Sequence, residues 1–424
     1  MKVLEMVHGI IWGPWTVGVF LVVGLVLSVR CRFFQIRGFR YWWKATAGSL
    51  WGEEREGDES TGAAGAHHGI TQFQSVCTAL AATVGTGNIA GVAAALVSGG
   101  PGAVFWMWIS ALIGMATAYG ETYLGVRYRF KNNRGKWICG PFVYMKKGLG
   151  IPFMAACYSF FCFLCALGMG SMVQANSAAE TLEFTWGIPS VLGSGILALL
   201  TGAVILGGIK RIGKAAEYLL PLASGIYILF SLLVLLLCAD RIPDAFLRIF
   251  QSAFGIRQVS GGIAGFGISK SIRYGISRGV FSNEAGLGTL AVLHGPAEHT
   301  TPEEQGMWAM FEVFFDTVVL CSLTALVILC TTQGDTETLS LTGAALAAAC
   351  FSAKLGVIGE WFIGICFCHC DRMVLPGTAG NRRSVSFFQD LSGLIFRSSI
   401  CRRLYQAGSS MDAVGSVEWT DGIF

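Results

Sequence analysis

The residues Ala81-Ala82-Thr83-Val84-Gly85-Thr86-Gly87-Asn88 interrupt an apolar stretch that runs from residue 70 to residue 97. The stretch is long and apolar enough to span a membrane, but the two glycines, two threonines and asparagine cost about 4 kcal/mol of helix propensity relative to alanine. Backbone groups freed by a break need partners, because hydrocarbon offers none. Ion-coupled transporters use such breaks to hold their ligands. The sequence therefore predicts a broken membrane helix with a binding site at the break.

Composition places the rest of the chain in a membrane as well. Of its 424 residues, 53% are apolar and 13% are charged, whereas a soluble domain carries about 25% charged residues. Its 56 glycines suit helices that pack closely in lipid. The net charge of +4 is too small to favour a nucleic-acid partner. We expect an all-α polytopic membrane protein that is embedded in a lipid bilayer.

Apolar stretches of spanning length recur along the chain. They are predicted at 10–29, 70–97, 103–126, 153–178, 188–206, 218–239, 306–331 and 341–370, with a glycine-rich, less apolar region at 245–295. Sixteen Lys and Arg lie in the connecting segments 30–69, 127–152 and 207–217, but only three lie in the segments expected on the opposite side. We expect a multi-pass protein of the bacterial cytoplasmic membrane, and the positive-inside rule predicts that its N-terminus lies outside.

The first break offers ligands for a cation and for an amino acid. A hard cation such as sodium prefers oxygen ligands, and the predicted set is Ala82, Thr83, Val84 and Asn88. The half-helix that resumes near Gly87 directs free N–H groups and a positive dipole end inward, which suits a carboxylate. The predicted substrate-binding residues here are Thr83, Gly85, Thr86, Gly87 and Asn88. A glycine kink that serves packing alone is the alternative.

A second break is predicted at 275–288, where four glycines lie near Ser282 and Asn283. Both polar residues are predicted to bind substrate, because breaks in corresponding spans of two halves indicate a site between inverted repeats. Ionisable residues inside a membrane are functional candidates. Arg278 and Glu284 could act at the site or pair to close a gate.

A third polar feature lies further along the chain. Glu312 and Asp316 are four residues apart in an apolar stretch. On a helix, residues four apart share one face. They are predicted either to carry a proton or ion, or to bond to the second broken segment.

Three ordered motifs resemble those of one transporter family. They are TALAATVGTGNIAGVA at 78–93, GGPGAVFWMWISALIG at 99–114 and RGVFSNEAGLG at 278–288. Spaced matches continue at Pro302, Gln305-Gly306, Phe315-Asp316-Thr317 and Thr324. Over residues 7–365 the chain is similar to the alanine or glycine:cation symporters, also called sodium:alanine symporters.

The resemblance implies a fold and a function. The implied fold is leucine-transporter-like, with two inverted five-helix repeats and an extra helix. In this chain it gives an extra helix at 10–29, a first repeat at 70–239 and a partial second repeat at 245–365. The implied function is uptake of alanine or glycine with sodium, occasionally protons, by alternating access. Such a protein is a secondary symporter, not an enzyme, and needs no cofactor beyond the co-transported sodium ion.

The C-terminal part departs from the family pattern. The family fold needs eleven spans, and nine at most are found here. Residues 366–424 form a divergent polar tail without another run of spanning length. A reading-frame change near residue 365 is our hypothesis, with weak or no transport as its expected result. A non-transporting truncated product, and a proton- or sodium-coupled permease of the same architecture for another small substrate, therefore stay open as alternatives.

Overall fold

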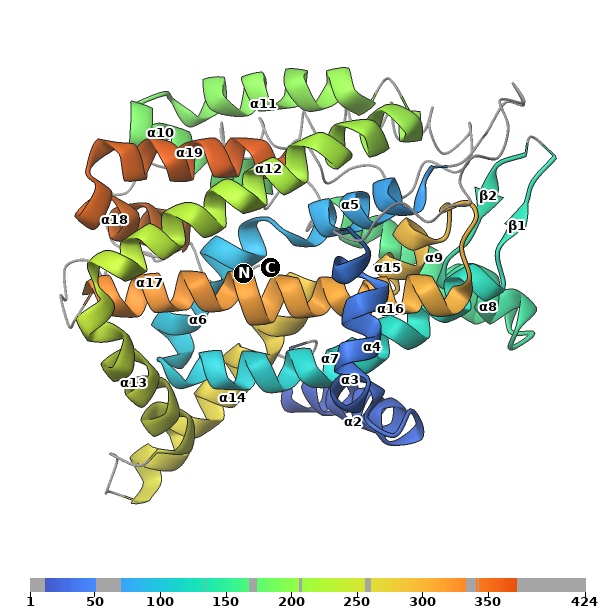
Figure 1. Ribbon diagram of the computed structural model, residues 1–424, viewed down its shortest axis with the longest axis horizontal. Coiled ribbons are helices and arrows are strands. Elements are labelled where there is room, and N and C mark those ends of the chain that lie inside the picture. Colours follow the sequence, from blue (N-terminus) through green and yellow to red (C-terminus); the bar gives the residue numbers. More distant parts are fainter. Residues whose placement is uncertain are drawn as a thin grey trace, which may run out of the picture.

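The protein is an α-helical bundle with one short β-hairpin (Figure 1). The computed structural model describes residues 12–50, 70–133, 135–167, 174–205, 208–255, 261–332, 341 and 343–371. The helices of the first half are α2 (Pro14–Arg30), α3 (Phe34–Arg37), α4 (Phe39–Ala45), α5 (Gln72–Thr83), α6 (Val92–Gly99), α7 (Gly102–Arg127), α8 (Pro141–Lys147), α9 (Pro152–Leu167), α10 (Gln174–Trp186) and α11 (Ser190–Ile205).

The second half continues in the same way. Its helices are α12 (Gly208–Leu237), α13 (Ile242–Phe254), α14 (Gly261–Asn283), α15 (Thr289–His294), α16 (Pro302–Val313), α17 (Ser322–Thr332), α18 (Gly343–Leu355) and α19 (Val357–Asp371). Two π-helical segments, η2 (Gly87–Gly91) and η5 (Phe314–Cys321), join α5 to α6 and α16 to α17. The hairpin strands β1 (Phe130–Lys131) and β2 (Trp137–Ile138) are antiparallel, and 3-10 turns lie at Ala47–Leu50 and Ala239–Arg241.

Several helices are long and apolar enough to cross a bilayer. Among the described residues these are Gly102–Arg127, Gly213–Leu237 and Pro302–Thr332. The pair Gln72–Thr83 and Gly87–Gly99 forms a fourth span if its two bent parts count as one. Large apolar side chains point outward from α2 and α12, with Leu236 73% exposed, as expected of surfaces that face lipid. The chain is therefore a multi-pass membrane protein, as predicted.

Helix α7 packs against both α14 and α16, and in Figure 1 it lies below the line of α16 and α17. Glycines permit this approach: a Cβ on Gly275 would overlap the carbonyl of Ala103, and one on Gly279 would overlap the hydroxyl of Ser110. Small residues commonly allow such close packing in membranes. The glycines at the start of the predicted second break thus serve helix packing. Helix α14 continues through them to Asn283, and the chain leaves the helix only at 284–288.

The predicted last span at 341–370 is wrong as one continuous helix. Gly356 adopts a φ of +60°, a left-handed conformation that glycine accepts readily, and the chain turns there between α18 and α19. The two helices pack on each other, and a Cβ on Gly359 would lie 2.5 Å from the Phe351 carbonyl oxygen. The predicted span 153–178 corresponds to α9 and α10, with 168–173 outside the described residues. Residues 372–424, most of the predicted tail, also lie outside them.

Candidate cation and substrate site

The first predicted break is present in the structure. Helix α5 begins with a capping box in which Thr71 and Gln74 bond to each other's backbone N–H, and it ends at Thr83. Val84 is extended, with φ −74° and ψ +100°, and the two helical parts meet at a bend of 43°. The π-helix η2 then leads into α6. The break begins at Val84, three residues later than the quoted stretch.

Asn88 stabilises the break and connects it to a distant helix. Its Oδ1 accepts a hydrogen bond of 2.9 Å from the freed N–H of Gly85. Its Nδ2 donates to Asp316 Oδ1 at 2.6 Å and to the Asp316 carbonyl at 3.1 Å. One side chain thus satisfies a backbone donor that the break exposes and links η2 to η5, a segment more than 200 residues away.

Asp316 lies where both broken segments meet. Its Oδ2 accepts hydrogen bonds from Ser282 Oγ at 2.8 Å and from Thr317 Oγ1 at 2.9 Å. Its exposure is 0%. The partners in these bonds are neutral, and the ion pairs found among the described residues do not include Asp316. A buried carboxylate without a basic partner is costly. This carboxylate is therefore suited to receive a cation.

The two breaks also touch directly. A Cβ on Gly87 would lie 3.0 Å from Ser282 Cα, so the end of α14 packs against the backbone of η2. Asn283 Nδ2 donates to Thr317 Oγ1 at 3.0 Å, and Asn283 Oδ1 accepts from Ala285 N at 3.1 Å. Asn283 therefore contacts Asp316 indirectly, through the Thr317 hydroxyl, and stabilises the start of the second break. We call Asn88, Ser282, Asn283, Asp316 and Thr317 the Asp316 cluster.

A second layer surrounds this cluster. Thr324 Oγ1 donates to the Asn88 carbonyl at 2.7 Å, and Tyr227 OH lies 2.6 Å from the same hydroxyl. The Tyr227 ring stacks against Phe362 of α19. These contacts connect the first break to α12, α17 and α19. They also fix the Asn88 carbonyl, so that neighbouring backbone groups are held in position.

The second break is stabilised by a carboxylate from α7. Glu121 Oε2 accepts hydrogen bonds from Gly286 N at 3.2 Å and Gly288 N at 3.0 Å. The two glycines have φ values of +91° and +82°, which side-chain-bearing residues rarely adopt. The resulting turn presents two N–H groups to one oxygen atom. Glu121 therefore acts as an anchor for the loop between α14 and α15.

The loop between α15 and α16 is held by Arg129, which follows the end of α7. The guanidinium donates to the carbonyls of Gly295, Ala297 and Thr300 and lies over the ring of Trp137. Burial lowers the pKa of Arg129 from its ordinary value, because it disfavours the charged form. The guanidinium thus binds backbone carbonyls at the end of α15 and just before α16.

The structure brings some predicted site residues together and separates others. Asn88, Ser282 and Asn283 belong to the Asp316 cluster, and Gly87 touches it. The Thr83 hydroxyl bonds back to carbonyls of its own helix, at 3.4 Å to Ala79 and 3.3 Å to Leu80. The remaining predicted residues lie beside the cluster: Gly85 and Thr86 are buried, and Ala82 and Val84 are half-buried. Their roles in binding substrate or sodium stay predictions.

Asp316 was predicted as an ionisable candidate but not as part of the same site as Asn88. The signal was its position in an apolar helix four residues after Glu312. No sequence pattern distinguishes Tyr227 from a packing residue, because tyrosine in an apolar helix commonly serves packing. His294 was not among the predicted site residues; it ends α15, and its exposure is 0%.

The chain is similar to known proteins over most of its length. The model of the sodium:alanine symporter family matches residues 1–389. The sodium/alanine symporter AgcS of Methanococcus maripaludis is 40% identical over 369 residues, which are 85% of this chain and 77% of that protein. The probable sodium/glutamine symporter GlnT of Bacillus subtilis is 34% identical over 371 residues, covering 86% of this chain and 73% of that protein.

Among solved structures, a manganese transporter of Eremococcus coleocola matches with a TM-score of 0.49 and 14% identity, covering 80% of this chain and 72% of that one. The family match carries the assignment, because it spans most of the chain. The chain therefore belongs to the sodium:alanine symporter family, whose members are cation-coupled amino-acid symporters and not enzymes.

Proposed function

We propose that this chain couples an inward sodium gradient to the uptake of a small neutral amino acid, alanine or glycine, by alternating access. The Asp316 carboxylate is the single observation that carries the proposal. It is buried between two helix breaks and bonded to neutral donors. A sodium ion, or the ammonium group of an amino acid, would supply the positive charge that this site lacks.

The tight geometry favours a small substrate. Gly87 contacts the backbone of Ser282 without an intervening side chain, and the polar side chains around Asp316 are between 0% and 2% exposed. Alanine and glycine have the smallest side chains and therefore require the least separation of these segments. The relative named as a sodium/alanine symporter supports this choice, whereas the relative named for glutamine makes glutamine the main competitor to test.

Uptake into proteoliposomes tests the proposal. We expect saturable uptake of labelled alanine with sodium outside and little uptake when choline replaces sodium. Unlabelled glycine should compete strongly, glutamine weakly and uracil not at all. Strong inhibition by glutamine or uracil would contradict the substrate assignment. Uptake driven equally by a proton gradient without sodium would contradict the coupling ion.

A binding assay separates a failure of transport from a failure of the site. The melting temperature of the detergent-solubilised chain should rise with sodium, and alanine should raise it further. Stabilisation without uptake would favour the non-transporting alternative. Absence of both responses would contradict the proposed site.

A further inference from the structure

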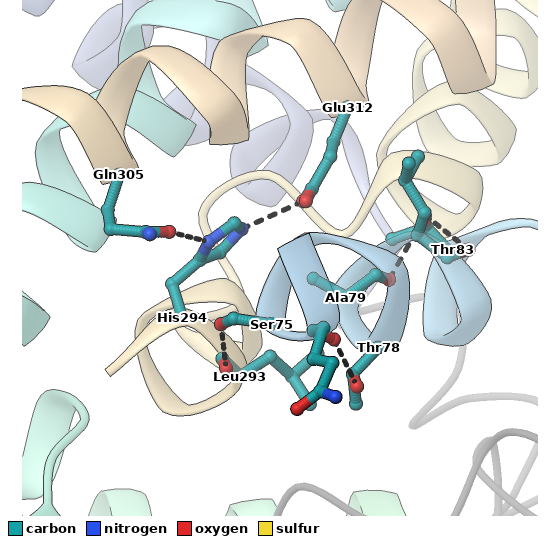
Figure 2. Close-up of polar contacts among 10 residues, drawn as sticks. Ser75, Thr78, Ala79, Thr83, Leu293, His294, Gln305 and Glu312 are labelled. Carbon is teal, nitrogen blue, oxygen red and sulfur yellow. Dashed lines mark hydrogen bonds and ion pairs between the residues drawn. The ribbon is translucent and has the colours of Figure 1, made fainter. Parts of the chain in front are cut away.

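A second buried polar group lies beside the Asp316 cluster without belonging to it. His294, the last residue of α15, is 0% exposed and contacts two residues of α16 (Figure 2). Its Nδ1 lies 2.6 Å from Gln305 Oε1, and its Nε2 lies 3.0 Å from Glu312 Oε2. Gln305 and Glu312 are 0% and 1% exposed. The imidazole is thus enclosed between an amide and a carboxyl group.

The hydrogen-bond pattern determines how many protons the group holds. Gln305 Nε2 donates to Thr300 Oγ1 at 3.2 Å, which leaves Gln305 Oε1 facing the imidazole. An amide oxygen can only accept, so His294 Nδ1 carries a hydrogen. One further proton is then shared between His294 Nε2 and Glu312 Oε2. The pair is electrically neutral with that proton, whichever of the two atoms carries it.

Glu312 has an additional, unused acceptor. Its Oε1 is buried and has no hydrogen-bond partner among the residues that the structure describes. A buried oxygen atom without a hydrogen-bond partner costs less free energy on a neutral carboxyl group than on a carboxylate, because burial penalises charged groups most strongly. Loss of the shared proton would leave a net negative charge in a sealed place and set the Nε2 lone pair against a carboxylate. The contact between His294 and Glu312 therefore depends on the proton.

The contact between His294 and Glu312 joins α15 to α16, and α15 is in turn bonded to α5. Ser75 of α5 donates to the Leu293 carbonyl at 2.9 Å, so α15 is bonded to the first half of the broken helix (Figure 2). His294 bonds the same α15 to α16. The shared proton therefore joins a unit built from both broken segments to the helix that continues into Asp316.

Other ionisable groups surround Glu312 at longer range. Cys77 of α5, Glu284 before α15 and Asp316 in η5 all interact electrostatically with it. From α7, Tyr119 packs against Gly306 of α16. Each of these groups is neutral or negative. The nearby cation is Arg129, whose guanidinium donates to the carbonyl of Gly295, next to His294. His294 is the basic group in direct contact with Glu312.

We propose that His294 and Glu312 form a proton-binding site, separate from the Asp316 cluster, whose shared proton holds α15 to α16. Protonation favours the conformation described above. Rising pH removes the proton and releases α15 together with the adjoining half of α5. The proton site can be tested by thermal stability alone. Only the uptake measurement also rests on the proposed transport function.

The first test is the melting temperature of the full chain in detergent as a function of pH. Between about pH 6 and pH 9, the wild-type melting temperature should fall by roughly 2–4 °C more than that of Glu312→Gln. The amide of Glu312→Gln can still donate to His294 Nε2, but it does not titrate. Glu303→Gln is the matched control, because Glu303 is exposed on the same helix, and it should behave as wild type.

His294→Gln provides a second variant and should also lose this extra fall. If both variants retain the wild-type pH dependence, the proposal is wrong. A wild-type profile without such a fall overturns it as well, even if neither variant folds.

The second test is sodium-driven alanine uptake across the same pH range. The wild-type rate should change by about fivefold or more as the shared proton is lost, and the rate of Glu312→Gln, which cannot lose that proton, by less than about twofold. Equal pH profiles for both proteins would refute the proton site while leaving sodium-coupled uptake intact. Alanine uptake that does not depend on sodium would refute the proposed function. The proton site would still be supported if the predicted difference in melting temperature were observed.

Discussion

Two buried carboxyl groups lie four residues apart on one helical stretch, yet their surroundings differ. Asp316 accepts hydrogen bonds from an amide and two hydroxyls and has no basic partner in these bonds. Glu312 faces an imidazole that can exchange a proton with it. The first arrangement leaves a negative charge to be met by a ligand, and the second supplies its own titratable partner. Partners, more than residue type, thus decide which cation each carboxyl group is suited to bind.

Of the substitutions that test this difference, Asp316→Asn should have the largest effect, and the affected quantity is sodium affinity. Asp316→Asn removes the charge but keeps the size, so sodium should bind about 100-fold more weakly, corresponding to a loss of about 3 kcal/mol for a buried charge-assisted contact. Sodium-dependent melting temperature and uptake both measure this change. Glu303→Gln serves as the control. Wild-type sodium affinity in Asp316→Asn would show that the two carboxyl groups do not differ as described.

A steric change at the contact of the two breaks comes next. Gly87→Ala places a methyl group 3.0 Å from Ser282 Cα, and overpacking of this kind costs about 1–3 kcal/mol. We expect a lower melting temperature and roughly tenfold slower uptake. Gly225→Ala on α12 is the matched control, since a Cβ there would meet nothing within 4 Å. Equal behaviour of the two variants would argue against close contact between the breaks.

A third buried carboxyl group sharpens the distinction. Glu121 bonds to the N–H groups of Gly286 and Gly288 and so has partners for a structural role. Glu121→Gln should lower the free energy of unfolding by about 1 kcal/mol, because a neutral acceptor forms weaker bonds. Sodium-induced stabilisation should stay at the wild-type level. A lost sodium response would assign Glu121 to the cation site.

The smallest expected effect lies in the second layer of the cluster. Tyr227→Phe removes the hydroxyl bonded to Thr324, and interhelical hydrogen bonds in membranes contribute about 0.6 kcal/mol on average. Uptake should fall by about two- to threefold, as that energy implies. Tyr218→Phe, at an exposed position on the same helix, controls for loss of a phenol. An effect as large as that of Asp316→Asn would mean that Tyr227 contacts the ligand itself.

The first break could be predicted because its cause is local. Two glycines and the polar residues around them disfavour a helix whatever surrounds them, and the bend at Val84 follows. The second break was predicted too early, since Gly275 and Gly279 look the same in sequence whether they interrupt a helix or allow one to pack. Only their contacts with α7 distinguish the two roles, and these contacts come from the fold.

Long-range partners account for the rest. Asn88 and Asp316 are separated by more than 200 residues, and no periodicity links them. His294 shows only its position at the end of a segment, so its burial against Glu312 could not be anticipated. The turn at Gly356 was missed because the stretch 341–370 is apolar enough overall to resemble one span, although Lys354 and Glu360 lie on either side of the turn. The positive φ that folds α19 back onto α18 depends on tertiary packing.

The enclosure of the Asp316 cluster has a kinetic consequence. With exposures of 2% or less, its polar side chains cannot be reached by diffusion through an open pore. An ion or solute must wait until helices part, and such rearrangements take microseconds to milliseconds. Throughput then has a ceiling of about 10³–10⁶ events per second, set by backbone motion. The rate of the proposed transport would therefore saturate as the solute concentration rises.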